Sequence, residues 1–342
     1  MSRPTTATGK GDPARIGVIG AGAWGTALAA TEARAGHRVT LWAREPEVAG
    51  AIVTRHENPL YLPGITLPET IEATTDPAAL AASDAVLLVT PAQAVREVMA
   101  AFAAHLAPAT PLVICAKGIE RASGRFLDEV VREVAPRLVP FVLSGPSFAR
   151  DVARGLPAAV TLAGDDIADA RRLARMLSHR VFRLYSSDDV RGVQIGGALK
   201  NVLAIACGIV DGLGLGDSAR AALLTRAFAE LARFGRALGA RVETLHGLSG
   251  LGDLALTATS GQSRNYSLGR ALGEGRALDD ILGERRAVTE GVFTASIAVR
   301  LAREHAIDMP ICESVHAVVS GASTPRAEVE RLLARPLRDE AG

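Results

Sequence analysis

The chain has 342 residues, of which 48% are hydrophobic, and a formal net charge of +1 at pH 7. This length and composition exclude a disordered protein and supply enough apolar residues for two packed domains. The charge is balanced, without a long run of either sign, and so gives no sign of a protein that binds nucleic acid or an anionic membrane. We therefore expect small-molecule partners.

The cysteines, the histidines and the N-terminal segment indicate whether the protein has disulfides, a metal site or a membrane segment. Cys115, Cys207 and Cys312 are widely spaced among apolar residues, which indicates neither a disulfide framework nor a zinc site and suggests buried thiols in a reducing cytoplasm. None of the seven histidines has metal-ligand spacing, so we expect no metal. The first thirteen residues lack the apolar core of a signal peptide, and no stretch reaches the roughly 18 apolar residues that span a bilayer. We therefore expect no membrane insertion.

The first expected element is a strand over Arg15 to Gly20 that runs into a G-x-G-x-x-G turn. Gly20 permits the tight turn, Gly22 lets the backbone approach a phosphate, and Gly25 lets the following helix pack against the strand with its N-terminus facing the anion. A bare G-x-G-x-x-G can be a flexible loop, but this one lies between a strand and a helix. It therefore predicts a dinucleotide site.

The second expected strand, over Arg38 to Ala43, ends at Arg44 and Glu45. NAD sites usually place an acid here to accept a hydrogen bond from the ribose 2′-hydroxyl, whereas a guanidinium can pair with the 2′-phosphate of NADP. Arg44 favours NADP, and Glu45 leaves NAD open. The alternative is that both side chains only solvate the start of the next helix.

Short apolar runs alternate with helical patterns up to Tyr185, which predicts an α/β Rossmann-type, doubly wound parallel sheet. The strands are expected at residues 15–20, 38–43, 85–90, 112–116, 140–143, 158–163 and 181–185. From about Val190 to Ala334 only helical spacing remains, so the second domain should be all-α. The predicted division is a tail at 1–13, a dinucleotide-binding domain at 14–189, a helical substrate-binding domain at 190–335 and a tail at 336–342.

Polar residues follow two of the predicted strands, at the sheet edge where ligands of such folds lie. One apolar run ends in Lys117, and another ends in the Ser-Gly-Pro-Ser turn of residues 144–147. A cation and a hydroxyl-bearing turn on the same edge as Gly22 would suit a phosphate-bearing substrate. The alternatives are a solvent-exposed lysine and an ordinary turn capped by Ser147.

The segment from Gln194 to Asp211 predicts a helix that is apolar nearly all round, with one narrow polar or small-residue face. That face carries residues 194, 197, 201, 204, 208 and 211. Lys200 lies beside it, and Gly197 would leave room for a substrate. Because burial disfavours the charged form of a lysine, the pKa of Lys200 can approach the working pH, which suits a proton donor and acceptor in carbonyl reduction. A buried structural ion pair is the competing interpretation.

Two further positions in the helical part are candidates. Asp253 is an acid in apolar surroundings, which either orients Lys200 and tunes its charge or only caps a helix. Ser263 is placed to cap a second helix, where Arg264, Asn265 and free backbone N–H groups could bind a phosphate. The alternative for this segment is an exposed, capped helix without a ligand.

Seven segments occur in the order found in bacterial NAD(P)-dependent glycerol-3-phosphate dehydrogenases, which the chain resembles over nearly its whole length: GAGAWG, AKGIE, SGPSFA, GGALKN, GLGDL, QSRN and VTEG. The resemblance implies a catalytic set of Lys200, Asp253 and Lys117, with Lys200 as the proton donor and acceptor. The implied substrate contacts are Lys117, Gly145, Ser147, Lys200, Asn201, Asp253, Ser263, Arg264 and Asn265. The expected cofactor contacts are Gly20, Gly22, Ala23, Trp24, Gly25, Arg44, Lys117, Ala149, Arg264, Val288 and Glu290.

The resemblance further implies reversible reduction of dihydroxyacetone phosphate to sn-glycerol 3-phosphate for glycerophospholipid biosynthesis, with NADP(H) or NAD(H) and no metal. The sequence leaves a homodimer open. Glu45 stands where many family members carry a base, which weakens the expected grip on a 2′-phosphate. Two alternatives are a 3-hydroxyacid dehydrogenase of similar architecture, which would take a carboxylate in place of the phosphate, and a non-enzymatic NAD(P) sensor.

Overall fold

Eight strands form a single sheet in the order β3-β2-β1-β4-β5-β6-β7-β8. The computed structural model describes residues 13–284 and 289–337. The strands are β1 (Arg15–Ile19), β2 (Arg38–Trp42), β3 (Ile71–Thr74), β4 (Ala85–Leu88), β5 (Pro111–Ile114), β6 (Val139–Ser144), β7 (Ala158–Ala163) and β8 (Phe182–Ser187). The expected Rossmann-type sheet is therefore present, with one further strand, β3, that the apolar runs did not predict.

The sheet is not parallel throughout, which corrects the prediction of a parallel sheet. Strands β1 to β6 pair in parallel, but β7 runs antiparallel to β6, and β8 is parallel to β7. An apolar run predicts that a strand is buried, but it does not predict whether the strand runs parallel or antiparallel to its neighbour. Strand β3 escaped notice because it is half-buried and carries the sequence Ile-Glu-Ala-Thr, without an apolar run.

Helices cover both faces of the sheet, as a doubly wound fold requires. One apolar cluster joins β1 and β2 to the helices α1, α2 and α6. A second cluster joins β4 and β5 to α3 and α4. The helical elements of this half are α1 (Ala23–Ala35), α2 (Pro46–Arg55), η1 (Pro77–Leu80), η2 (Ala92–Ala94), α3 (Val95–Phe102), α4 (Leu127–Val134), α5 (Ala149–Ala153) and α6 (Ile167–Leu177).

The turn between β1 and α1 depends on its glycines. Gly20 has a positive φ of 112°, and a Cβ atom on Gly25 would lie 1.8 Å from the carbonyl oxygen of Gly20. Only a glycine at position 25 therefore lets α1 approach the turn this closely. A Cβ atom on Gly22, the N-cap of α1, would meet nothing within 4 Å. The space above the N-terminus of α1 is open.

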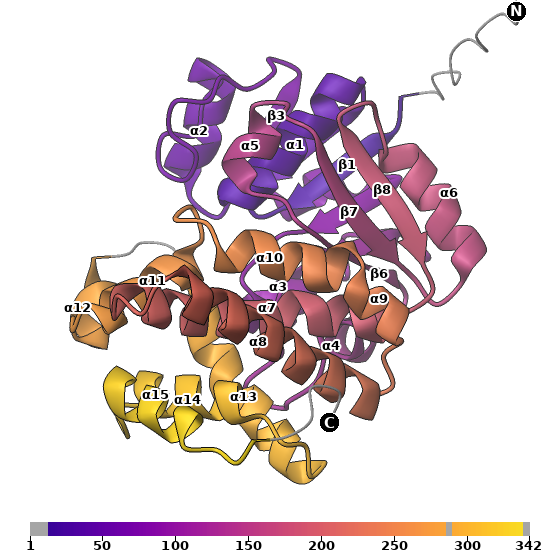
Figure 1. The fold of residues 1–342 in the computed structure, drawn as a ribbon. Helices are drawn as coiled ribbons and strands as arrows, with labels where there is room; N and C mark the ends of the chain where they lie inside the picture. Colours follow the sequence, from indigo (N-terminus) through magenta and orange to yellow (C-terminus); the bar gives the residue numbers. More distant parts are fainter. Residues whose placement is uncertain (1–12, 285–288, 338–342) are drawn as a thin grey trace, which may run out of the picture.

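No strand follows Ser187 in the part of the chain that the structure describes, and the C-terminal half is helical (Figure 1). The long helix α7 is its centre. The elements are α7 (Val190–Gly212), α8 (Asp217–Ala237), α9 (Val242–His246), the π-helical turn η3 (Leu248–Gly252), α10 (Asp253–Ala258), α11 (Arg264–Gly273), α12 (Leu278–Gly283), α13 (Glu290–Glu304), α14 (Pro310–Val319) and α15 (Pro325–Leu333).

Glycines on α7 and α11 let these two helices touch backbone to backbone. A Cβ atom on Gly208 would lie 2.1 Å from the Tyr266 carbonyl oxygen, and one on Gly269 would lie 2.0 Å from the Ile205 carbonyl oxygen. Part of the small-residue face predicted for α7 therefore serves helix packing.

Helix α7 is also long and apolar enough to cross a membrane by length and composition alone. The expectation that no stretch is apolar enough was wrong, because a helix can be apolar on average although isolated polar residues interrupt its apolar run. The apolar stretch of α7 is entirely buried inside the protein. Packing in the core of the C-terminal half accounts for its hydropathy.

Candidate active site

One carboxylate orients two lysine side chains at the junction of the two halves. Asp253, the first residue of α10, accepts a hydrogen bond from Lys200 of α7 on Oδ1, and on Oδ2 it accepts one from Lys117 at 2.7 Å. Lys200 Nζ also donates to Thr257 Oγ1 at 3.0 Å. The buried ion pair that the sequence allowed for Lys200 is present, and a second lysine shares its carboxylate.

Burial changes the acidity of this cluster. The side chains of Lys200 and Asp253 are 8% and 1% exposed, and that of Lys117 is 16% exposed. Burial lowers the pKa of Lys200 to about 7; the charge of Asp253 opposes this shift, and the charge of Lys117 adds to it. Lys200 can therefore give or take a proton near neutral pH.

The cluster lies at the carboxyl ends of β5 and β6. Lys117 follows β5, and its Nζ donates to the carbonyl oxygen of Gly145, just after β6, at 3.0 Å. The Ser147 hydroxyl donates to the same carbonyl oxygen at 3.0 Å and closes the turn. Gly145 has a φ of 152°, and a Cβ atom there would lie 2.8 Å from Val160 Cα. Only glycine fits this position, so the turn presents its backbone directly to Lys117.

The space beside Gly197 is filled, contrary to the expectation that it leaves room for a substrate. A Cβ atom on Gly197 would lie 2.7 Å from Ser144 Oγ and 3.4 Å from Lys117 Cγ. The absence of a side chain at this position instead makes room for the hydroxyl group of Ser144, and the stem of Lys117 lies nearby.

Two buried amides connect α7, α11 and α13. Asn265 Nδ2 donates to Asn201 Oδ1 at 2.8 Å, and the Gly291 amide donates to Asn265 Oδ1 at 3.1 Å. Asn201 Nδ2 faces the carbonyl oxygens of Lys117 and Gly197, both at 3.4 Å. Both asparagines, expected at the substrate, are thus already held in a defined orientation beside the lysine cluster.

The N-terminus of α11 is capped as the sequence predicted. Ser263 is the N-cap, and its Oγ accepts from the Tyr266 amide at 3.2 Å. Arg264, the first residue of the helix, is exposed, whereas Asn265 is buried. Capping and phosphate binding are compatible, because the cap engages only one of the backbone N–H groups at this end.

Glu290 connects the helical half to the edge of the sheet. Its Oε1 accepts from the amide of Ala92, at the start of η2 after β4, at 2.9 Å. Its Oε2 is buried and has no hydrogen-bond partner among the described residues. Burial raises the pKa of Glu290, against the opposing effects of the Ala92 amide and the Arg264 charge. An unpartnered carboxylate oxygen next to Gly118 is a group that a bound polar ligand could satisfy.

The residues around α1 fit a dinucleotide. The first turn of α1 carries no acidic residue, and its N-cap, Gly22, has no side chain that could occupy the free backbone N–H groups of that turn. The space that a Cβ atom on Gly22 would enter is open. Ala23 and Trp24 form this first turn, and Ala149 begins α5, which packs against α1. A helix N-terminus of this kind attracts a pyrophosphate.

Models of one protein family match both halves of the chain. The model described as NAD-dependent glycerol-3-phosphate dehydrogenase N-terminus matches residues 15–170, and the corresponding C-terminus model matches residues 189–330. The chain belongs to the NAD-dependent glycerol-3-phosphate dehydrogenase family.

Individual relatives agree with this family assignment. The glycerol-3-phosphate dehydrogenase (NAD(P)+) of Rhodospirillum rubrum is 61% identical over 328 residues, which cover 96% of this chain and 94% of the relative. That of Parvibaculum lavamentivorans is 55% identical and covers 95% of this chain and 98% of its own. The crystal structure of a glycerol-3-phosphate dehydrogenase from Coxiella burnetii has a TM-score of 0.90 and 40% identity, and covers 94% of this chain and 99% of its own.

Some features of this family site were expected from the sequence and others were not. Val288 lies outside the described residues. Thr257, which touches both Lys200 and Asp253, was missed, although its position four residues after Asp253 on α10 would have placed the two side chains on one helix face. The contact between Glu290 and Ala92 joins residues 198 apart in sequence, and no sequence pattern indicates it.

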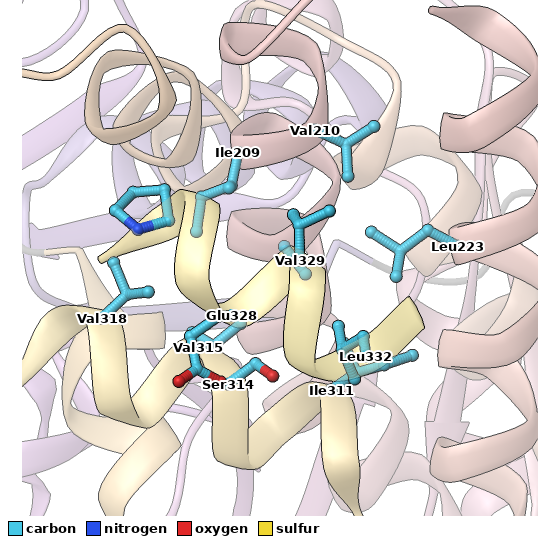
Figure 2. A pocket seen from close by; sticks show the side chains of 12 residues that line it. Ile209, Val210, Leu223, Ile311, Ser314, Val315, Val318, Glu328, Val329 and Leu332 are labelled. Atoms are coloured by element: carbon cyan, nitrogen blue, oxygen red, sulfur yellow. The ribbon is translucent and has the colours of Figure 1, made fainter. Parts of the chain in front are cut away.

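A small apolar cavity of about 30 Å³ lies between α7, α8, α14 and α15 (Figure 2), which is roughly the room that one water molecule takes. It is lined by Ile209, Val210, Leu223, Ile311, Val318 and Leu332, among others. Within residues 13–284 and 289–337, no group of three or more His, Cys, Asp or Glu side chains could hold a metal ion. The lysine cluster is thus the stronger candidate.

Proposed function

We propose that the chain reduces dihydroxyacetone phosphate to sn-glycerol 3-phosphate and catalyses the reverse oxidation, with Lys200 as the group that moves the proton. The observation that carries this proposal is the pairing of a buried lysine whose pKa is about 7 with Asp253, at the sheet edge where a dinucleotide-binding fold holds its ligands.

The proton step follows from the position of Lys200. When bound, NAD(P)H supplies a hydride to C2 of the substrate. As negative charge develops on the C2 oxygen, the Lys200 ammonium donates a proton to it and becomes neutral; in the oxidation, neutral Lys200 accepts the proton from the C2 hydroxyl. A pKa near 7 lets one residue serve both directions.

Asp253 and Lys117 support this step in different ways. Asp253 fixes the Lys200 ammonium and keeps its pKa from falling further. Lys117 places a second positive charge at the Gly145 carbonyl, beside the turn that carries Ser147, and this charge would stabilise the developing oxyanion. Thr257 limits the directions in which Lys200 can donate.

The phosphate is assigned to the N-terminus of α11, with Ser263, Arg264 and Asn265. A guanidinium at a helix N-terminus combines a bidentate cation with backbone donors, which suits a phosphate group. Asn265 Nδ2 donates one hydrogen to Asn201 and has a second for the ligand. Binding the phosphate away from the reacting carbon positions C2 for the chemical step.

The cofactor is assigned to the turn of Gly20, Gly22 and Gly25, with Ala23, Trp24, Ala149, Arg44, Arg264 and Glu290. Val288 enters this set through the family resemblance alone. We further propose a cytoplasmic location and a supply of glycerol 3-phosphate for glycerophospholipids. A homodimer is tested by light scattering of the purified protein.

The test of the reaction is the initial rate of NADH and NADPH oxidation by the purified protein with dihydroxyacetone phosphate, dihydroxyacetone or a 3-oxoacid. We expect turnover with dihydroxyacetone phosphate and a much lower rate with dihydroxyacetone, which lacks the phosphate. Inorganic phosphate should compete with dihydroxyacetone phosphate. Turnover of the 3-oxoacid alone would instead indicate a hydroxyacid dehydrogenase. Cofactor binding without any turnover would favour the sensor.

A further inference from the structure

The end of β2 carries an acid at the position where dinucleotide folds read the ribose of the cofactor. Glu45 is the N-cap of α2 and lies about 20 residues after the last glycine of the G-x-G-x-x-G turn, the spacing at which an acid accepts a hydrogen bond from the ribose 2′-hydroxyl. Its neighbour Arg44 is the base that could instead bind a 2′-phosphate.

The structure pairs these two side chains with each other. Glu45 Oε1 accepts from Arg44 Nε at 3.2 Å, from Arg44 Nη2 at 2.7 Å and from the Tyr61 hydroxyl at 3.1 Å. Glu45 Oε2 takes none of these three bonds. The Arg44 side chain is 80% exposed, whereas that of Glu45 is 22% exposed. The carboxylate is therefore the more firmly held partner of the pair.

Tyr61 is itself tied to the glycine turn. The Tyr61 amide donates to Asn58 Oδ1 at 3.1 Å, and the buried Asn58 Nδ2 donates to the Ala21 carbonyl oxygen and to Thr26 Oγ1, both at 2.8 Å. The loop that carries Tyr61 is thus anchored at the turn assigned to the pyrophosphate. This connection keeps the Glu45 carboxylate in a fixed place relative to the rest of the cofactor site.

Glu45 also keeps its negative charge. Burial by itself would raise the pKa of its carboxyl, but the hydrogen bonds from Arg44 and Tyr61 outweigh that effect and hold the pKa below its ordinary value. An exposed pair such as Arg44 and Glu45 is weak, so Arg44 alone could turn toward a phosphate. The carboxylate, held by Tyr61, would remain and repel it.

We propose that Glu45 sets the cofactor choice and makes this chain prefer NADH to NADPH. Glu45 Oε2 accepts a hydrogen bond from the ribose 2′-hydroxyl, and the carboxylate both engages Arg44 and repels a 2′-phosphate. This inference rests on the proposed dinucleotide-dependent function and specifies its cofactor. It differs from the sequence-based expectation that Arg44 favours NADP, because the Glu45 carboxylate, which Tyr61 also holds, stays beside Arg44 and repels a 2′-phosphate.

The test is a titration of the purified protein with NADH and with NADPH, without substrate, followed by the quenching of tryptophan fluorescence. We expect the wild-type protein to bind NADH about 10-fold or more tightly than NADPH, the size of a lost charge-assisted hydrogen bond. Glu45→Gln should tighten NADPH binding by about 10-fold and weaken NADH binding only a few-fold.

Matched variants make this result specific. Glu47→Gln removes the same charge from an exposed residue two positions further along, so it should leave the ratio of the two dissociation constants within about 2-fold of wild type. Adding Arg44→Ala to Glu45→Gln should abolish the gain in NADPH binding. Tyr61→Phe should reduce the preference for NADH without removing it.

Two results would overturn the proposal: wild-type protein that binds NADPH as tightly as NADH, or a Glu45→Gln ratio equal to that of Glu47→Gln. Because no substrate is present, these outcomes are independent of the reaction. A protein that discriminates between the cofactors as expected but does not reduce dihydroxyacetone phosphate would contradict the proposed reaction and leave the role of Glu45 supported.

Discussion

Lys200 and Asp253 form an ion pair inside the protein, and the carboxylate oxygen that Lys200 does not engage holds Lys117. One negative charge therefore faces two positive charges in a space with little water. In such a space the charge of each group depends on its neighbours. The acidity of Lys200, and with it the pH range of activity, should respond to each member of this cluster.

The pH dependence of the reduction tests this relationship. The Lys200 ammonium must be protonated to donate, and its pKa is lowered to about 7, so kcat for the reduction should fall as the pH rises through about 7. Asp253→Asn removes the charge that raises this pKa while Lys117 stays. The falling limb of the kcat profile should then move to lower pH.

Asp253→Glu serves as the matched control, because it keeps the negative charge. The falling limb of its kcat profile against pH should stay near the wild-type position. Circular dichroism and the NADH dissociation constant show whether the variants are folded. A limb that stays in place in folded Asp253→Asn would mean that the carboxylate does not tune Lys200.

Arg264→Ala tests the assignment of the phosphate. Losing a bidentate cation should raise the KM for dihydroxyacetone phosphate by about 10-fold or more, with a smaller effect on kcat. Arg270→Ala is the control, since Arg270 is exposed on the same helix and pairs with Glu274. Steady-state kinetics measure both constants. If Arg264→Ala left the KM of substrate and cofactor unchanged, its place in the site would be wrong.

Two glycines of the first turn should respond differently to alanine. Gly22→Ala adds a methyl group to open space, so the protein should fold and melt normally but bind NADH about 10-fold or more weakly, because the methyl group blocks the approach of the pyrophosphate. Gly25→Ala places a methyl group 1.8 Å from the Gly20 carbonyl oxygen and should destabilise the turn itself.

Gly50→Ala is the control for both, because its Cβ atom also meets nothing within 4 Å and it lies on α2, outside the proposed site. Melting temperature and NADH affinity separate the three cases. Equal NADH affinity of Gly22→Ala and Gly50→Ala would argue against pyrophosphate binding at α1.

Glu230 should make stability depend on pH. It is 3% exposed, and its oxygens accept from the amides of Ile311 and Cys312 at the start of α14. Burial raises its pKa from 4.5 to about 7, despite those two amides. The folded state thus binds the proton more tightly than the unfolded state does. Protonated Glu230 therefore contributes about 3 kcal/mol to the free energy of unfolding below pH 4.5, and this contribution is lost as the pH rises through 7.

Glu230→Gln removes this titration and keeps one acceptor oxygen for the helix. Its stability relative to wild type should therefore increase between pH 4.5 and 8, which urea unfolding at several pH values measures. A constant difference across this range would show that Glu230 is not a source of the pH dependence.

The fold could be predicted from the sequence to the extent that local patterns encode it. Alternating apolar and helical segments, and the glycines between β1 and α1, indicated the dinucleotide-binding sheet. The antiparallel direction of β7 could not be predicted, because burial of a strand is independent of its direction. Strand β3 was missed because an edge strand needs no apolar run.

The candidate site was predicted residue by residue but not as a network. Lys200 stood out as a charge in an apolar helix, and Asp253 as an acid in apolar surroundings, so their meeting could be suggested. That Lys117 would share the carboxylate, and that Gly197 would make room for the Ser144 hydroxyl rather than a substrate, depends on how β5, β6, α7 and α10 pack together. Such distances are properties of the tertiary structure.

The most direct measurement is the initial rate of NADH oxidation with dihydroxyacetone phosphate, in wild-type protein and in Lys200→Met, with the NADH dissociation constant measured on the same samples. Methionine nearly fills the volume of the buried lysine but carries no proton. We expect turnover by the wild-type protein, a kcat lower by on the order of 10²-fold or more in the variant, and unchanged NADH binding. A nearly unchanged kcat in Lys200→Met would show that Lys200 does not move the proton.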